Sequence, residues 1–288
     1  MNSMNLHIAA MALVLVVLSP GRASTRAQPQ APITGILGAF SDEVAILEQA
    51  LTDAQPQTIL GIRFVTGKLM GRRVVVASSG VGKVNAAMSA TLLIDHFRPS
   101  EVLYSGIAGA VNPDLHPGDI VIGEKTVQHD LGTLTPEGIQ RRGMRNPVDW
   151  KPNPVFLDAD PELLGLAEVA RKRVELEKIQ TSEGQRTPKI IKGIVATGDV
   201  FVASPAKKEE LRKALNADAV EMEGAAVAQV CRELGVPCLV IRSITDSADA
   251  NARKDSNLFF PVAAQNSSRL VMDIVGQLAS APAPRKRR

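Results

Sequence analysis

Hydrophobic and polar positions along this chain alternate between two periods. Short apolar runs bounded by glycine or polar residues indicate strands, and apolar residues three or four positions apart indicate helices. The predicted strands cover 33–38, 62–66, 74–78, 102–105, 120–127, 190–197 and 239–244. The predicted helices begin near Asp42 and otherwise cover 84–97, 161–174, 205–215, 222–234 and 261–278. This alternation predicts an α/β sheet with helices on both faces.

The N-terminus has a different pattern. Residues 8–18 form an unbroken run of eleven apolar residues, followed by Pro20 and Gly21. The run is shorter than the ~20 residues that span a bilayer, and it is typical of the apolar part of a secretory signal. We expect a signal peptide over 1–27, cleaved after Ala23 or Ala27, and export to the periplasm or the exterior without a stable membrane anchor. The alternative is an uncleaved tether, or a wrongly assigned start and a cytoplasmic protein.

Between these terminal segments the sequence predicts one large domain. A linker is expected over 28–32, a single domain over 33–278 and a disordered basic tail over 279–288. Within the domain, residues 131–158 fit neither period and are predicted to be a long surface insertion. Loops of that length are uncommon and are often functional.

Composition and charge exclude several classes of protein. The 288 residues are 45% hydrophobic and 22% charged, which is a globular composition. The formal net charge is +3, but residues 1–27 carry +2 and the last four residues carry +4, which leaves −3 for residues 28–284. A mildly acidic body with nine aromatic residues does not favour a nucleic-acid partner.

Cysteines and histidines are few. Two cysteines and four histidines form no ligand-like cluster, so we predict no metal site and no disulfide framework. Cys231 falls on a helical pattern and Cys238 opens a strand. Buried free thiols are the favoured interpretation, and a bridge between them stays open.

Two glycine-containing turns follow predicted strands. The stretch 79–83 does not satisfy the phosphate-loop motif, because Ala77 and Val84 stand where glycine and serine or threonine belong. It also fails as a dinucleotide fingerprint, since Asn85 replaces the third glycine. The second turn is Gly106–Gly109. Ligands of open α/β sheets bind beyond the carboxyl ends of strands, so both turns are expected to line one pocket.

Four acidic residues lie at strand ends or helix starts: Glu43, Glu221, Glu223 and Asp246. Each has a purely structural explanation when it is considered alone. Negative charge in a first helical turn is favoured by ~0.3–1 kcal/mol, and an aspartate often caps a turn after a strand.

The order of the motifs adds information that no single residue carries. In chain order they are Gly35–Val44, Ser79–Ala87, Ser105–Gly109, Pro117–Val121, Thr197–Phe201, Val220–Ala226 and Arg242–Asp246. This series resembles the nucleoside phosphorylase superfamily, and within it the methylthioadenosine/S-adenosylhomocysteine nucleosidases. The similarity covers residues 33–130 and 190–278, and Val-Glu-Met-Glu at 220–223 is its most specific part.

The resemblance implies a fold and a reaction. The fold would be a single α/β domain around a central mixed, partly barrel-like sheet flanked by helices, and the protein would be a homodimer. The reaction would be hydrolysis of the N-glycosidic bond of a purine nucleoside, releasing adenine and a 5-substituted ribose without a cofactor. Such a reaction serves methionine salvage.

The resemblance also implies roles for individual residues. Asp246 would donate a proton toward N7 of the purine, and Glu43 would activate the water that attacks the oxocarbenium-like sugar. Glu223 would bind the ribose hydroxyls while Met222 packs on the sugar, and Glu221 would support them.

The adenine would lie between two elements. Phe201 would stack on the base and the backbone of Val202 would hydrogen-bond its edge. The turn residues Ile107, Ala108 and Gly109 complete the substrate-binding set.

Two departures from the family pattern concern the pocket. Ile107 stands where the family commonly has serine, and Ser256 stands where it places a phenylalanine against the 5′ group. The insertion over 131–158 replaces a further part of that wall. The sequence therefore does not determine which 5′ substituent the substrate carries.

Two alternatives remain. A phosphorylase would use phosphate in place of water, but the family's phosphate-binding arginines are missing from Gly38–Asp42 and from the residues before Gly106. A non-catalytic nucleoside-binding relative would lack Glu43 or Asp246, and both are present.

Overall fold

The computed structural model describes residues 31–181 and 184–280. The predicted signal peptide, most of the linker and residues 281–288 of the predicted tail lie outside the described residues. The strands are β1 (Ile33–Gly38), β2 (Thr52–Ile59), β3 (Ile62–Leu69), β4 (Arg72–Ser78), β5 (Glu101–Ala110), β6 (Ile120–Gln128), β7 (Gly132–Thr135), β8 (Gly138–Arg141), β9 (Phe156–Asp158), β10 (Ile179–Thr181), β11 (Gly184–Arg186), β12 (Ile190–Thr197), β13 (Ala219–Glu221) and β14 (Cys238–Asp246). The helices are α1 (Ser41–Gln49), α2 (Lys83–Phe97), α3 (Pro161–Ala170), α4 (Pro205–Leu215), α5 (Gly224–Glu233) and α6 (Ala252–Ser280).

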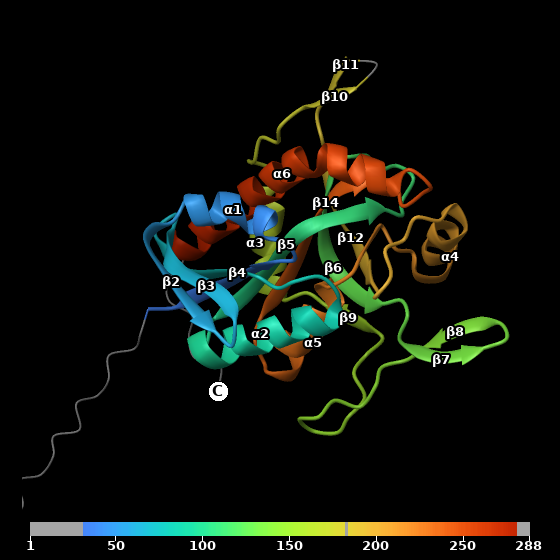
Figure 1. The fold of residues 1–288 in the computed structure, drawn as a ribbon, viewed down its shortest axis with the longest axis horizontal. Helices are drawn as coiled ribbons and strands as arrows, with labels where there is room; N and C mark the ends of the chain where they lie inside the picture. The colour runs from blue at the N-terminus through green and yellow to red at the C-terminus, as the bar shows by residue number, and fades with distance from the viewer. Residues whose placement is uncertain (1–30, 182–183, 281–288) are drawn as a thin grey trace, which may run out of the picture. The chain divides into compact units, whose positions relative to one another are not determined.

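The main sheet is mixed and closes on itself at one end. Its strand order is β13-β12-β6-β14-β5-β1-β4-β3-β2, and β13 also pairs with β5. Strands β13, β12, β6, β14 and β5 therefore form a ring, from which β1, β4, β3 and β2 extend as an open sheet (Figure 1). The predicted single α/β domain with a partly barrel-like sheet is confirmed.

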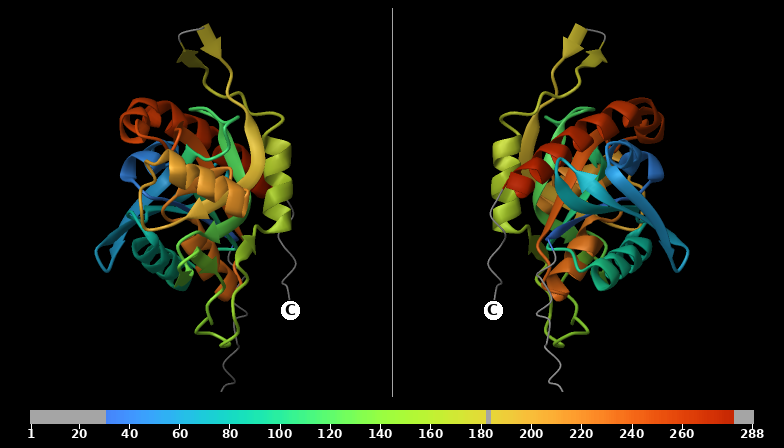
Figure 2. Two further views of the ribbon diagram at one scale, coloured as in Figure 1. Left: turned by 90° about the vertical axis from the view of Figure 1, so that its right-hand side faces the viewer. Right: turned by 90° about the vertical axis from the view of Figure 1, so that its left-hand side faces the viewer.

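Helices cover the sheet on two sides. Buried residues of α1, α3 and α6 share one core cluster with alternate residues of the strands, including Leu47, Ala167 and Ile274. Buried residues of α2 and α5, such as Leu93 and Val227, share a second cluster with the other face. Figures 1 and 2 show α1 and α6 on the side of the sheet opposite α2 and α5. The apolar periodicity predicted this arrangement because each helix buries a single stripe.

The start of the last helix was predicted wrongly. Proline is favoured in a first helical turn, so the pattern indicated a start at Pro261. Helix α6 instead begins at Ala252 and contains Pro261. Its early turns are held by contacts with other elements: the rings of Phe260 and Phe40 meet edge to face, and Ser256 lies against Thr245. The helix also continues to Ser280, two residues past its predicted end.

Strand β2 escaped prediction altogether. It pairs antiparallel with β3 at the open edge of the sheet, and its residues are almost all exposed. It contains Pro56, which is tolerated on edge strands because the missing N–H faces away from the ladder. An exposed strand with a proline carries no hydrophobic alternation to detect.

The predicted insertion over 131–158 is partly regular. Strands β7 and β8 form a small antiparallel hairpin, and β9 joins the main sheet through β6. The strand residues of this hairpin are all exposed or half-buried. A second unpredicted hairpin, β10–β11, follows α3.

The two cysteines are buried and free, as favoured from the sequence. Helix α3 ends four residues before its predicted end. Helix α5 begins two residues later and ends one residue earlier than predicted. Within residues 31–181 and 184–280, no helix combines the length and apolar character needed to cross a bilayer.

Candidate active site

A cavity of about 330 Å³ lies where the carboxyl ends of β5, β13 and β14 converge. Nine of the ten residues predicted to form the site line it: Ile107, Ala108, Gly109, Phe201, Val202, Glu221, Met222, Glu223 and Asp246. Val81 from the first glycine turn lines the same cavity. The first glycine turn and the Gly106–Gly109 stretch therefore face one pocket, as expected. The prediction of a second turn was wrong, because Gly106–Gly109 lies within β5 and pairs with β14.

Glu43, the tenth predicted residue, lies just behind the cavity wall. One carboxylate oxygen accepts a hydrogen bond from the backbone N–H of Phe40 (3.0 Å), and the other accepts from Ile107 (3.0 Å). Both donors belong to residues that line the cavity. Burial raises the pKa of Glu43, although the nearby Arg242 and these backbone donors oppose the shift. A buried carboxylate with a raised pKa is suited to accept a proton from water.

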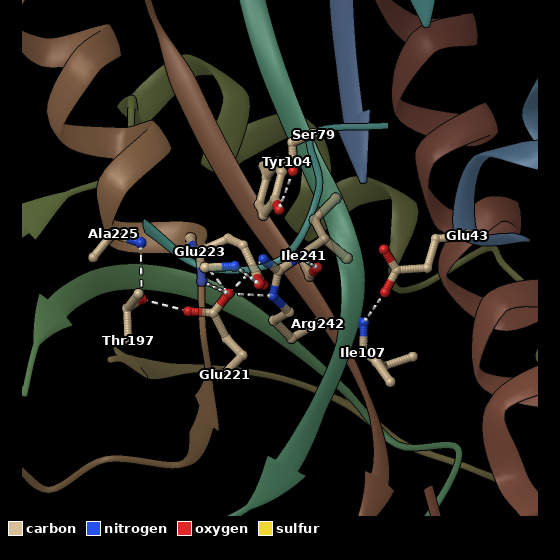
Figure 3. A network of polar contacts seen from close by, with 12 residues as sticks. Glu43, Ser79, Tyr104, Ile107, Thr197, Glu221, Glu223, Ala225, Ile241 and Arg242 are labelled. Carbon is tan, nitrogen blue, oxygen red and sulfur yellow. Dashed lines mark hydrogen bonds and ion pairs between the residues drawn. The ribbon is translucent and has the colours of Figure 1, made fainter. Parts of the chain in front are cut away.

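Glycine at position 106 allows Glu43 to reach the sheet. A Cβ atom on Gly106 would lie 2.8 Å from a carboxylate oxygen of Glu43 and 2.9 Å from Nη1 of Arg242. Any side chain there would displace both groups. Figure 3 shows Glu43 beside Ile107, with Arg242 between them and Glu221. This glycine of β5 therefore allows close packing of charged side chains.

Glu221, which lines the cavity, forms a buried pair with Arg242. Oε2 of Glu221 accepts hydrogen bonds from Nε (3.0 Å) and Nη2 (2.5 Å) of Arg242. The same carboxylate accepts from the backbone of Glu223 and Gly224 and contacts the hydroxyl of Thr197. With so many protein partners, Glu221 is held in place, which agrees with a supporting role.

Arg242 was not singled out by the sequence analysis. Its side chain is 1% exposed, and its guanidinium lies 4.3 Å from the centroid of the Tyr104 ring. The neighbouring carboxylates raise its already high pKa, so it remains charged. A signal was available: an arginine inside an otherwise apolar strand needs a buried partner, because an unpaired buried charge is very costly.

Glu223 differs from its neighbour Glu221. Its Oε1 accepts a hydrogen bond from the backbone N–H of Gly82 (2.8 Å). Burial and the charge of Glu221 raise its pKa to about 7, against the opposing effect of Arg242. Gly82 has φ +91°, a conformation that favours glycine, and this turns its N–H toward the carboxylate. The first glycine turn therefore positions an acid.

Asp246 lies at the end of β14 and is 2% exposed. Oδ1 accepts from the backbone N–H of Ala248 (2.9 Å), and Oδ2 is 2.9 Å from the hydroxyl of Thr245. Burial raises the pKa of Asp246, and the charges of Asp249 and Asp255 add to the effect. A raised pKa keeps a carboxylic acid protonated closer to neutral pH, which suits a proton donor.

Lys83, the residue that made the first turn look like a phosphate loop, is used structurally. Its Nζ lies 2.6 Å from Asp130 and 3.6 Å from Asp199. The backbone N–H of Lys83 also donates to Asp199, and that of Asp199 donates to Asp130. These contacts tie the first glycine turn to the segment that carries Phe201.

Helix α6 supplies three further lining residues: Arg253, Ser256 and Asn257. The sequence analysis did not place these three residues together because it predicted that the helix begins at Pro261, after all of them. The guanidinium of Arg253 lies 5.6 Å from the centroid of the Phe201 ring. Within the described ranges, no group of three or more His, Cys, Asp or Glu side chains is arranged to hold a metal ion.

Comparisons with known proteins agree on one family. A family model described as the phosphorylase superfamily matches residues 33–276. The 5′-methylthioadenosine/S-adenosylhomocysteine nucleosidase of Marinomonas sp. (strain MWYL1) is 36% identical over 245 residues, which is 84% of this chain and 98% of the relative.

Solved structures give the same result. The nucleosidase of that name from Colwellia psychrerythraea 34H, in complex with adenine, superimposes with a TM-score of 0.74 and 36% identity, covering 86% of this chain and 96% of the other. The futalosine hydrolase of Helicobacter pylori superimposes with a TM-score of 0.72 and 32% identity, covering 86% and 98%.

Proposed function

The chain belongs to the phosphorylase superfamily, and we propose that it hydrolyses the N-glycosidic bond of adenine nucleosides, as a nucleosidase of the 5′-methylthioadenosine/S-adenosylhomocysteine type. The family predicted from the motif series is confirmed. The observation that carries the activity is the convergence of Asp246, Glu223 and Phe201 on one cavity, with Glu43 directly behind its wall.

The two buried acids would act on different reactants: one on the leaving base and one on the attacking water. Asp246, with its raised pKa, would give a proton to N7 of the adenine, which turns the base into a better leaving group. Glu43 would take a proton from the attacking water on the side of the anomeric carbon. This division resembles other glycoside hydrolyses, in which one carboxyl acts as acid and the other as base.

The remaining lining residues would hold the nucleoside. Phe201 stacks on the adenine, and the backbone of Val202 hydrogen-bonds its edge. Met222 packs on the ribose and Glu223, presented by Gly82, accepts bonds from the ribose hydroxyls. Holding the reacting groups in one geometry contributes to the rate because less entropy is lost at the transition state.

Water is favoured over phosphate as the nucleophile. Arg242 is the arginine near Glu43, and its Nε and Nη2 are already bound to Glu221. The carboxylate of Glu43 itself would repel a phosphate anion. These contacts support hydrolysis rather than phosphorolysis.

The decisive experiment supplies purified protein with methylthioadenosine, S-adenosylhomocysteine, adenosine and inosine, each with and without phosphate. We expect release of adenine that does not depend on phosphate. Strict dependence on phosphate would identify a phosphorylase, and binding without release of any base would identify a non-catalytic nucleoside-binding protein.

Two finer properties belong to the same proposal. We infer a homodimer, because α2 exposes Val84 and Met88 one turn apart, beside the cavity-lining Val81. Val84→Glu should then lower the mass measured by light scattering toward that of one chain.

We further propose that residues 1–27 direct export, and that cleavage of the adenine nucleoside serves methionine salvage. The family match begins at residue 33, after the predicted leader. N-terminal sequencing of the protein recovered from cell fractions tests export: a mature chain beginning at Ser24 or Gln28 is expected.

A further inference from the structure

The first turns of helix α6 present a polar stripe to the cavity. Arg253, Ser256 and Asn257 occupy positions i, i+3 and i+4, which share one face of a helix, and all three line the cavity. Other lining residues, such as Val81 and Ile107, are apolar. One wall of the pocket is therefore polar because of where this helix begins.

Contacts on both sides hold this stripe against the site. The hydroxyl of Ser256 lies 3.3 Å from that of Thr245, the residue that contacts Asp246. One turn further along, the ring of Phe260 packs against Phe40 with centroids 6.2 Å apart. The polar stripe is thus anchored to the strand that carries the proposed acid.

The rest of the nucleoside is already assigned to other walls. In the proposed function, Phe201 and Asp246 face the base, Glu223 faces the ribose hydroxyls and Glu43 faces the anomeric carbon. The 5′ substituent is the part left to meet the α6 wall. Resting on that function, we propose that the α6 wall binds a 5′ substituent ending in an anion, with Arg253 as the specificity-determining residue.

The charges around the cavity support an anion at this position. Of the described residues that line the cavity, Arg253 is the one with a positive charge. No carboxylate within the described ranges lies at ion-pair distance from it, and its guanidinium lies over the ring of Phe201. Its five N–H donors suit a carboxylate or a phosphate.

An apolar 5′ group would fit this wall less well. A methylthio group facing Arg253, Ser256 and Asn257 would displace water without offering any acceptor to them. Sites built to hydrogen-bond a substrate disfavour the analogue that lacks the bonding group, because the donors that this analogue covers are left unpaired. The carboxylate of S-adenosylhomocysteine supplies the acceptor that methylthioadenosine lacks.

The test compares two substrates of the same size. S-adenosylhomocysteine and its carboxamide differ in one negative charge, and adenine release gives kcat/KM for each. We expect the carboxylate to be preferred by about tenfold at low salt, with a smaller preference at high salt because the arginine is exposed. Arg253→Met should bring the ratio close to one.

A matched control is the next residue of the helix. Lys254 is exposed and does not line the cavity, so Lys254→Met should keep the preference of the unmodified protein. The same assay is run with adenosine 5′-monophosphate as a third substrate. Faster cleavage of it than of S-adenosylhomocysteine, lost in Arg253→Met, would identify phosphate as the anion that Arg253 binds.

The outcomes separate the two proposals. Equal kcat/KM for the carboxylate and the carboxamide, or a preference that survives in Arg253→Met, would overturn the role of Arg253 while leaving the hydrolase intact. Absence of adenine release from every nucleoside, methylthioadenosine included, would overturn the proposed function, and the inference about Arg253 with it.

Discussion

The guanidinium of Arg242 and the carboxylate of Glu221 meet inside the protein, with Nη2 and Oε2 2.5 Å apart and the two side chains 1% and 3% exposed. Arg242 also lowers the pKa values of Glu43 and Glu223, against the effect of burial. One cation therefore limits the cost of burying three carboxylates close to each other.

Removal of Arg242 should destabilise the protein strongly. Arg242→Met leaves Glu221 buried and unpaired, and breaking a buried pair in this way costs about 3–5 kcal/mol. We expect this loss in the free energy of unfolding, measured by denaturant titration. A matched control is Arg72→Met, which breaks the buried Arg72–Glu101 pair away from the cavity. It should also destabilise, but kcat of the folded enzyme should stay unchanged.

Asp246→Asn should remove the proposed proton donor while retaining its shape. An asparagine can still accept from the backbone of Ala248, so the fold should persist. We expect kcat for adenine release to fall by about 10²–10⁴, the usual contribution of general acid catalysis. Asp249→Asn, in the same loop but outside the cavity lining, is the control: it removes only a charge that helps to raise the pKa of Asp246, so kcat should change far less than in Asp246→Asn. Undiminished turnover in Asp246→Asn would contradict the assignment of the acid.

Glu43→Gln should impair both catalysis and packing. The amide keeps one acceptor oxygen for the two backbone donors of Phe40 and Ile107, so one buried N–H loses its partner. We expect a loss of about 1–3 kcal/mol in stability and of about 10²–10⁴ in kcat, measured by thermal unfolding and adenine release. Glu48→Gln, on the same helix but paired with the exposed Arg63, should retain kcat.

Glu223 should make stability depend on pH. Its pKa of about 7 in the folded protein lies above the ordinary value of 4.5, so the folded state holds this proton more tightly than the unfolded chain. The contribution to stability is therefore complete below about pH 4.5 and is lost as the pH rises through about 7. The glutamine of Glu223→Gln stays neutral, so the Tm of this variant should fall less than that of the unmodified protein between about pH 4.5 and 7.

The control for the pH experiment is Glu209→Gln, which changes an exposed glutamate of α4. It should follow the unmodified protein at each pH. If Glu223→Gln also follows it, another group must account for any loss of stability over this range.

Elements with a hydrophobic pattern were predicted well. Strands β1 and β12 and helix α4 have the predicted bounds, because their buried positions are occupied by hydrophobic residues in a regular pattern. Strand β2 left no such record, since its residues are exposed. Helix α6 was shortened in prediction because a proline inside a helix is read as its first turn.

The candidate site was predicted from motif order rather than from geometry. The residues of the Val-Glu-Met-Glu stretch and Asp246 could be named in advance, and the structure brings them to one cavity. An arginine in an apolar strand indicated that Arg242 needs a buried partner, but the sequence did not identify Glu221 as that partner, because the contact joins two separate segments. The polar stripe of α6 was missed because it depends on where the helix begins.

The sequence by itself determined the alternation of strands and helices, the family and the chemical types of the acids, because these depend on local periodicity and residue identity. Only the tertiary structure decided that β13 pairs with both β12 and β5, and this closure brings Glu221 and Asp246 to the same end of the ring. It also decided that the pKa of Glu223 is raised, since this shift arises from burial and neighbouring charge, which exist only once distant segments have packed together.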